Sequence, residues 1–205
     1  MEKEIIAGRI TNPLLREAFL RVDRRDFLPE KYRKVAYDLE LADQPLWVTE
    51  NVTTTALNLG LSMLDVLDLR KGQRVLEVGT GGGYYTALMA EIVEHVVSVE
   101  IDREVLELAK RALANYKNVT LVEGDGSLGY EPLAPYDRAI VWAASPTLPC
   151  KIFDQLREGG VLVAPIGGET RQTLYKIVKR GGKPEIERLG EVIFMKLRGV
   201  CGFYY

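Results

Sequence analysis

A glycine-rich turn that follows an apolar run is the feature that most constrains this chain. Arg74-Val75-Leu76 leads directly into Glu77-Val78-Gly79-Thr80-Gly81-Gly82-Gly83-Tyr84-Tyr85, and a helix-like stretch follows. Glycines at every second position accept positive φ angles and let a ligand approach the main chain, because no Cβ intervenes. The spacing E-x-G-x-G-x-G differs from G-x-G-x-x-G, which aims a helix N-terminus at the pyrophosphate of a dinucleotide. The turn therefore predicts an α/β fold with a different cofactor, and a glycine-rich turn without a ligand is the alternative.

The same turn resembles the S-adenosylmethionine site of the Rossmann-like methyltransferases. The resemblance implies that S-adenosylmethionine is the cofactor and that the turn binds it. The turn residues expected to contact the cofactor are Glu77, Gly79, Thr80, Gly81, Gly83 and Tyr84.

Acidic residues close the next two predicted strands. The β-branched run Val96–Val99 ends at Glu100, about 20 residues beyond the turn, where an acid accepts hydrogen bonds from ribose hydroxyls. Glu100 and its neighbour Ile101 are therefore predicted to bind the ribose. The alternative is a solvated carboxylate ahead of a helix that Asp102 caps. After the run 118–122, the resemblance implies that Asp125, with Gly126, receives the adenine amino group.

Alternating apolar runs and helical patterns predict a Rossmann-like, doubly wound α/β fold with a mostly parallel seven-stranded sheet. Parallel strands covered on both faces are nearly all apolar. The runs of this kind are Val75–Val78, Val96–Glu100, Thr120–Val122, Arg138–Trp142 and Gly160–Ile166. Helices are expected between them, over Thr86–Val93, Arg103–Tyr116 and Cys150–Leu156.

The two ends of the chain are predicted to differ from this core. Residues 1–70 form an N-terminal helical and loop extension, with one helix starting at Pro13 and another opened by Thr53-Thr54-Thr55. Residues 71–205 form the methyltransferase core. The late runs Gln172–Val178 and Glu191–Leu197 flank a glycine-containing turn and predict an antiparallel C-terminal hairpin.

Composition narrows the class of protein. The formal net charge is −2, with 47% hydrophobic and 27% charged residues, which is ordinary for a globular enzyme and supplies no global basic field. Two isolated cysteines and one histidine leave little material for a metal site, a disulfide scaffold or a catalytic triad. No apolar run reaches the roughly 20 residues of a membrane helix. We expect a cytoplasmic enzyme without a metal and without a membrane partner.

Motifs along nearly the whole chain resemble the protein L-isoaspartate O-methyltransferase family. They are Val22–Pro29, Ala36–Asp38, Gln44–Leu46, the glycine turn, Gly124–Gly126, Ala134–Asp137, Trp142–Ala144 and Val192–Gly199. The resemblance implies methyl transfer to the carboxylate of damaged isoaspartyl residues in proteins. The family's acceptor motif Gln-Thr-Ile-Ser-Gln-Pro corresponds here to Val52–Leu57, which keeps one threonine and puts Thr55 in place of the serine. Thr53 and Thr55 are the candidate acceptor residues. Loss of the amides predicts a different acceptor, and ordinary divergence is the alternative.

A second departure points to a base. Ser145-Pro146 follows the fourth strand, where methyltransferases that act on amino groups of bases place an Asp/Asn/Ser-Pro-Pro-aromatic motif. Its oxygens accept hydrogen bonds from the exocyclic amine while an aromatic ring stacks on the base. Trp142 is predicted to supply that ring. Further stacking candidates are Trp47, Phe203, Tyr204 and Tyr205.

Two groups of basic residues suit a phosphate backbone. The first comprises Arg21, Arg24, Arg25, Lys31, Arg33 and Lys34, and the second Lys176, Lys179, Arg180 and Lys183. A solvated surface is the alternative for both groups. With Ser145, Pro146 and Trp142, they favour an exocyclic amino nitrogen of an RNA base as the methyl acceptor, of the cytidine N4 type in rRNA or tRNA. The alternative is an isoaspartyl carboxylate O-methyltransferase in protein repair, whose partners are isoaspartyl-containing proteins.

Overall fold

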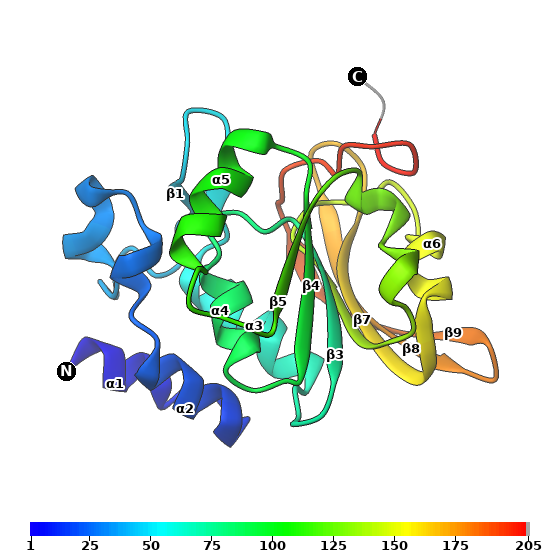
Figure 1. Cartoon of the computed structure of the whole chain (residues 1–205), viewed down its shortest axis with the longest axis horizontal. Helices are drawn as coiled ribbons and strands as arrows, with labels where there is room; N and C mark the ends of the chain where they lie inside the picture. The colour runs from blue at the N-terminus through cyan, green and yellow to red at the C-terminus, as the bar shows by residue number, and fades with distance from the viewer. Residues whose placement is uncertain (204–205) are drawn as a thin grey trace.

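The computed structural model describes residues 1–203 and places a seven-stranded sheet at the centre of the molecule (Figure 1). The strand order is β5-β4-β3-β6-β7-β8-β9. The pairs among β3 to β7 are parallel, and β8 and β9 are antiparallel to their neighbours. The strands are β3 (Arg74–Val78), β4 (His95–Glu100), β5 (Val119–Glu123), β6 (Tyr136–Val141), β7 (Leu156–Gly167), β8 (Gln172–Arg180) and β9 (Lys183–Val192). The predicted fold class is confirmed.

Helices cover both faces of this sheet. In Figure 1, α3, α4 and α5 lie on one face, with α1 and α2 outside them, and α6 lies on the other. The helices are α1 (Glu2–Ala7), α2 (Pro13–Arg21), α3 (Leu57–Leu67), α4 (Tyr84–Ala90), α5 (Arg103–Ala112) and α6 (Cys150–Asp154). Short 3-10 helices are η1 (Arg24–Phe27), η2 (Glu30–Val35), η3 (Gly126–Leu128) and η4 (Glu131–Leu133).

Local sequence explains where several helices begin. The Asp102 carboxylate accepts hydrogen bonds from the Glu104 and Val105 amides at 3.0 and 3.2 Å, which caps α5 as predicted. Asn12 caps α2 in the same way, and Pro13 occupies its first turn. Both caps satisfy amides that have no partner inside the helix.

The N-terminal elements share one apolar cluster with the sheet. Buried residues of α1, α2 and α3 contact the same cluster as Val75, Ile140 and Val163 of the strands. A second cluster, on the α6 side, contains Leu76, Val97 and Ile152. The division of the chain near residue 70 stays a prediction.

Three predicted elements differ from the structure. Thr53-Thr54 does not open a helix but forms the short strand β2 (Thr53–Thr54), antiparallel to β1 (Leu46–Trp47). The β-branched threonines suit an extended backbone, and α3 begins only at Leu57.

The second strand of the hairpin begins earlier than predicted, because Gly181 and Gly182 adopt φ angles of 57° and 73° and turn the chain within two residues. β9 is a largely exposed edge strand, which carries no continuous apolar signal and tolerates Pro184. Helix α5 also ends at Ala112 rather than Tyr116.

Strand order reverses at β3, since β4 and β5 lie on one side of it and β6 and β7 on the other. In open α/β sheets, ligands bind outside the carboxyl ends of the strands at such a switch point. The glycine turn leaves β3 at this position.

Candidate active site

A pocket lies at the carboxyl ends of β3, β4 and β6. One side, which we call the strand-end wall, consists of Val78–Tyr85, Val99–Ile101, Gly126, Trp142 and Ala143. The rest of the lining, which we call the front wall, consists of Arg24, Phe27, Leu28, Val52–Thr55 and the tail residues Met195–Arg198.

The glycine turn forms part of the strand-end wall. Gly79 has a φ of 93°, and its amide donates to the Val99 carbonyl at 2.8 Å, which fixes the turn to β4. A Cβ on Gly79 would lie 3.4 Å from the Trp142 Cβ and on the pocket surface. Only glycine combines this backbone angle with close approach of a ligand. The predicted residues Gly79, Thr80, Gly81, Gly83 and Tyr84 all line the pocket.

Glu77 is completely buried and is not part of the pocket lining, and its contact with the cofactor stays a prediction. One carboxylate oxygen accepts from the Thr86 and Ser98 hydroxyls, each at 2.6 Å, and the other from the Trp142 indole at 2.8 Å. Complete burial raises the pKa of this carboxyl to about 7, against the opposing effect of these donors. Glu77 therefore positions Trp142 and the start of α4 from behind.

Glu100 lies at the end of β4 and lines the pocket with Ile101. Its carboxylate accepts from the Gly81 amide at 3.1 Å and from the Asp102 amide at 3.0 Å. The side chain is 7% exposed, so it is not the solvated carboxylate of the alternative interpretation. These bonds hold the glycine turn and leave an anionic group on the pocket surface.

Asp125 does not line the pocket, although Gly126 does. The carboxylate of Asp125 accepts from the Ser127 amide and hydroxyl and, through its other oxygen, from the Val200 amide at 2.8 Å. Asp125 thus joins η3 to the C-terminal tail.

Ser145 and Pro146 are placed outside the pocket, which contradicts their predicted role as acceptor residues. Ser145 is completely buried. Its amide donates to the Pro165 carbonyl, and its carbonyl accepts from the Gly167 amide, both in β7. Ser145 extends the sheet through a bridge to Ile166, and its buried hydroxyl does not reach the pocket.

Trp142 lines the pocket but is already packed. Its ring stacks on Tyr85, with centroids 4.6 Å apart and an interplanar angle of 24°. Of the other stacking candidates, Trp47 and Phe203 do not line the pocket, and Tyr204 and Tyr205 lie outside the described residues.

Thr53 and Thr55 line the front wall, and their role as acceptor residues stays a prediction. The Tyr85 hydroxyl donates to the Thr55 and Ala56 carbonyls at 3.0 and 3.1 Å, which joins this segment to the strand-end wall. The Thr53 hydroxyl contacts the Met195 sulfur at 3.7 Å. Sequence reasoning missed the tail residues as pocket lining, although the tail carried part of the family resemblance.

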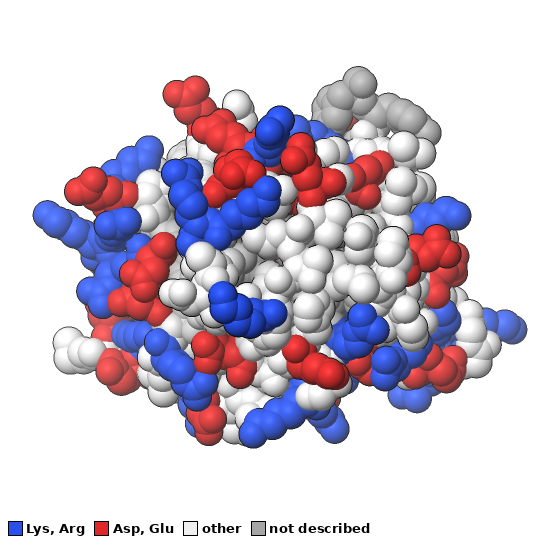
Figure 2. Space-filling view, viewed as in Figure 1, with Lys and Arg blue, Asp and Glu red and all other residues white. Residues whose placement is uncertain are grey.

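The predicted basic clusters do not form a continuous basic surface. Arg24 is buried, Arg25 pairs with Asp23 at 2.6 Å, and Arg180 pairs with Glu185 at 2.6 Å. Figure 2 shows acidic side chains interspersed among the basic ones on the face in view. This surface gives no support to a phosphate backbone as the ligand.

Within residues 1–203, no group of three or more His, Cys, Asp or Glu side chains is arranged to hold a metal ion. None of the helices in that range has the length and apolar character needed to cross a membrane.

A doubly wound sheet with a glycine turn after its first parallel strand and an acid after the next defines an S-adenosylmethionine-dependent methyltransferase. Residues 1–200 match the protein-L-isoaspartate(D-aspartate) O-methyltransferase family, and the chain belongs to that family.

Individual relatives agree over the full length. Protein-L-isoaspartate O-methyltransferase 1 of Archaeoglobus fulgidus is 43% identical, over 98% of this chain and 95% of its own. A solved protein-L-isoaspartate O-methyltransferase superposes with a TM-score of 0.88 at 29% identity, over 98% of this chain and 66% of that longer one. A putative Plasmodium falciparum enzyme of this name, solved with S-adenosyl-L-homocysteine, superposes with a TM-score of 0.81 at 25% identity, over 96% of this chain and 98% of its own.

These relatives overturn the predicted RNA acceptor. Full-length relatives at 40 to 44% identity carry the name protein-L-isoaspartate O-methyltransferase. The replacements at Val52–Leu57 are therefore divergence within the family.

Proposed function

We propose that this methyltransferase transfers the methyl group of S-adenosylmethionine to the carboxylate of isoaspartyl residues in damaged proteins. The match of residues 1–200 to the isoaspartyl family carries this proposal. The pocket supports it, because the threonines Thr53 and Thr55 line it together with the glycine turn.

S-adenosylmethionine supplies a methyl carbon bound to a positively charged sulfur. The pocket fits this cosubstrate, since the Cβ-free surface at Gly79 allows close approach and Glu100 presents a carboxylate. We assign the ribose hydroxyls to Glu100, with Ile101 beside them. Asp125 holds Ser127 and the tail at Val200, beside Gly126 in the pocket lining, and we keep it as the residue that receives the adenine amino group.

The chemical step requires positioning and no strong base. An acceptor carboxylate oxygen forms a bond to the methyl carbon as the carbon–sulfur bond breaks, and the carboxylate loses its charge while the sulfonium becomes neutral. No proton is transferred. The chain's part is to hold the two groups in line and to exclude water. Hydroxyl groups of Thr53 and Thr55 are suited to donate to the acceptor carboxylate.

The acceptor is tested by incubating the protein with tritiated S-adenosylmethionine and one of three substrates. These are an isoaspartyl peptide, the same peptide with a normal aspartyl residue, and deproteinised ribosomal RNA. We expect label only in the isoaspartyl peptide, in a form released by mild alkali as a methyl ester is. Alkali-stable label in RNA, or equal label in both peptides, would contradict the proposal.

A further inference from the structure

Arg24 is a buried cation with unused hydrogen-bond donors. Its side chain is 2% exposed, and Nη1 donates to the Ala36 carbonyl at 2.9 Å. Among residues 1–203, no acceptor lies within hydrogen-bonding distance of Nε or Nη2. A buried cation that has no carboxylate partner among the described residues costs stability, so its retention at this position calls for an anionic ligand.

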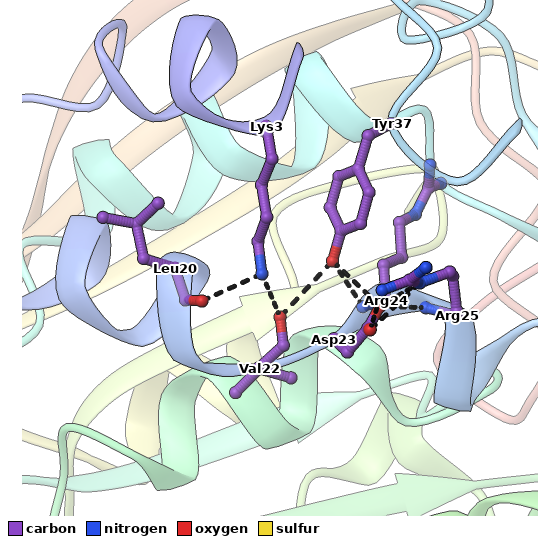
Figure 3. A network of polar contacts seen from close by, with 7 residues as sticks. All are labelled: Lys3, Leu20, Val22, Asp23, Arg24, Arg25 and Tyr37. Atoms are coloured by element: carbon purple, nitrogen blue, oxygen red, sulfur yellow. Dashed lines mark hydrogen bonds and ion pairs between the residues drawn. The ribbon is translucent and has the colours of Figure 1, made fainter. Parts of the chain in front are cut away.

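The neighbouring acid does not neutralise Arg24. The Asp23 carboxylate is engaged by Arg25, at 2.9 Å and 3.0 Å from Nε and 2.6 Å from Nη2, and it also accepts from the Tyr37 hydroxyl at 3.3 Å. Figure 3 shows these contacts as dashed lines. The Arg24 amide in turn donates to the Tyr37 hydroxyl at 2.7 Å, which fixes the backbone from which the guanidinium projects.

The unused donors belong to a residue that lines the pocket. Arg24 is part of the front wall, and its guanidinium carbon lies 5.9 Å from the centroid of the Tyr84 ring on the strand-end wall. The Tyr84 hydroxyl is also buried without a hydrogen-bond partner among the described residues. Burial raises the pKa of Tyr84 well above its usual value, which keeps this hydroxyl a neutral donor. Two residues with free donors therefore meet where η1 packs over the glycine turn.

We propose that Arg24, assisted by the Tyr84 hydroxyl, binds a carboxylate in this pocket. The planar guanidinium presents parallel N–H groups that match the two oxygens of a carboxylate. Two carboxylates enter the reaction proposed above: that of the methionine part of S-adenosylmethionine and that of the isoaspartyl acceptor. Only the second source rests on the proposed function.

The test combines removal of the guanidinium with removal of the carboxylate. Arg24→Met is compared with Arg25→Met, which makes the same change at an arginine that is paired on the surface. Calorimetry measures binding of S-adenosylmethionine and of its decarboxylated analogue to each protein. If Arg24 holds the methionine carboxylate, Arg24→Met weakens S-adenosylmethionine at least about 10-fold and leaves the analogue nearly unchanged. Arg25→Met changes neither.

The second arm measures the KM for an isoaspartyl peptide. A rise of at least about 10-fold, with unchanged affinity for S-adenosylmethionine, assigns Arg24 to the acceptor carboxylate. If neither quantity changes, or if both cosubstrate forms and the peptide are weakened equally, the proposal is wrong. The thermal midpoint of the ligand-free protein checks a purely structural role: we expect Arg24→Met to match or exceed the wild type, and a large fall would argue against a ligand-binding charge.

Arg24→Lys keeps the charge and removes the planar fork. Arg24→Lys should weaken the same ligand as Arg24→Met does, but by a smaller factor. If Arg24→Met does not fold, the result for Arg24→Lys tests the proposal instead. The cosubstrate arm needs no acceptor. Failure of the wild-type protein to methylate the isoaspartyl peptide would therefore refute the proposed function. The calorimetry with S-adenosylmethionine and its decarboxylated analogue would still test whether Arg24 binds the methionine carboxylate.

Discussion

The two walls of the pocket are built in different ways. Most of the strand-end wall follows directly from β3, β4 and β6, whose parallel register brings their carboxyl ends together. The front wall combines residues near 24, 52 and 195, which meet only through long-range contacts such as that of Thr53 with Met195. The strand-end wall is fixed by the sheet, whereas the front wall is assembled from distant loops. The sequence of the front wall can therefore diverge while the strand-end wall still binds the cosubstrate. The departures at Val52–Leu57 fit that division.

The largest effect should come from the glycine turn in the strand-end wall. Gly79→Val forces a branched side chain into a backbone with φ 93° and places it on the pocket surface. Strain and steric overlap should weaken S-adenosylhomocysteine about 100-fold in calorimetry. Gly168→Ala is the control, because its Cβ would meet no described atom within 4 Å. Similar affinities for the two variants would show that the turn is not a close-approach surface.

The buried carboxyl behind this wall should make stability depend on pH. Because burial raises the pKa of Glu77 from 4.5 to about 7, the folded protein holds a proton between these values that the unfolded chain has released. The contribution of this proton to the free energy of unfolding is present in full below pH 4.5. It decreases by roughly 3 kcal/mol as the pH rises to 7.

Urea unfolding of the wild type and of Glu77→Gln at several pH values isolates this term, because other groups cancel in the difference. Asp23, whose pKa the Arg25 side chain lowers to about 2, acts in a separate, more acidic window and with the opposite sign. A difference between the two proteins that stays constant from pH 4.5 to 7 would show that Glu77 is ionised throughout.

The hydrogen bonds that join the two walls should contribute less free energy than the buried Glu77 carboxyl. Tyr85→Phe removes the hydroxyl that donates to the Thr55 and Ala56 carbonyls. Loss of about 1 kcal/mol should raise the KM for an isoaspartyl peptide about 5-fold and leave S-adenosylhomocysteine affinity unchanged. Tyr175→Phe on β8, away from the pocket, is the matched control. A change confined to cosubstrate affinity would mean that Tyr85 does not support the front wall.

The smallest effect is expected at Ser145. Its hydroxyl is buried without a hydrogen-bond partner among the described residues, so Ser145→Ala should leave kcat and KM unchanged and alter stability by no more than about 1 kcal/mol. Ser98→Ala makes the same substitution where the hydroxyl donates to Glu77, and should be clearly destabilising. Loss of methyl transfer in Ser145→Ala, with folding intact, would return this residue to the active site.

The two walls also differ in how much of each could be predicted from the sequence. The sheet, the glycine turn and the position of Glu100 follow from patterns within about 25 residues, since alternating strands and helices bring such turns to one edge. The hairpin register was not predictable from apolar pattern, because β9 is an exposed edge strand. The front wall was predictable only in part, because its local signals resemble helix caps and surface loops.

The sequence alone determined the doubly wound methyltransferase fold and the glycine turn that lines its pocket. Both depend on local backbone preferences and on hydrophobic periodicity. Tertiary structure alone decided which polar groups reach the pocket. Glu77 faces inward to Trp142, 65 residues away, Ser145 is enclosed beside β7, and Arg24 is buried with donors unused. Burial and pairing are properties of contacts between distant segments, and motif spacing does not contain them.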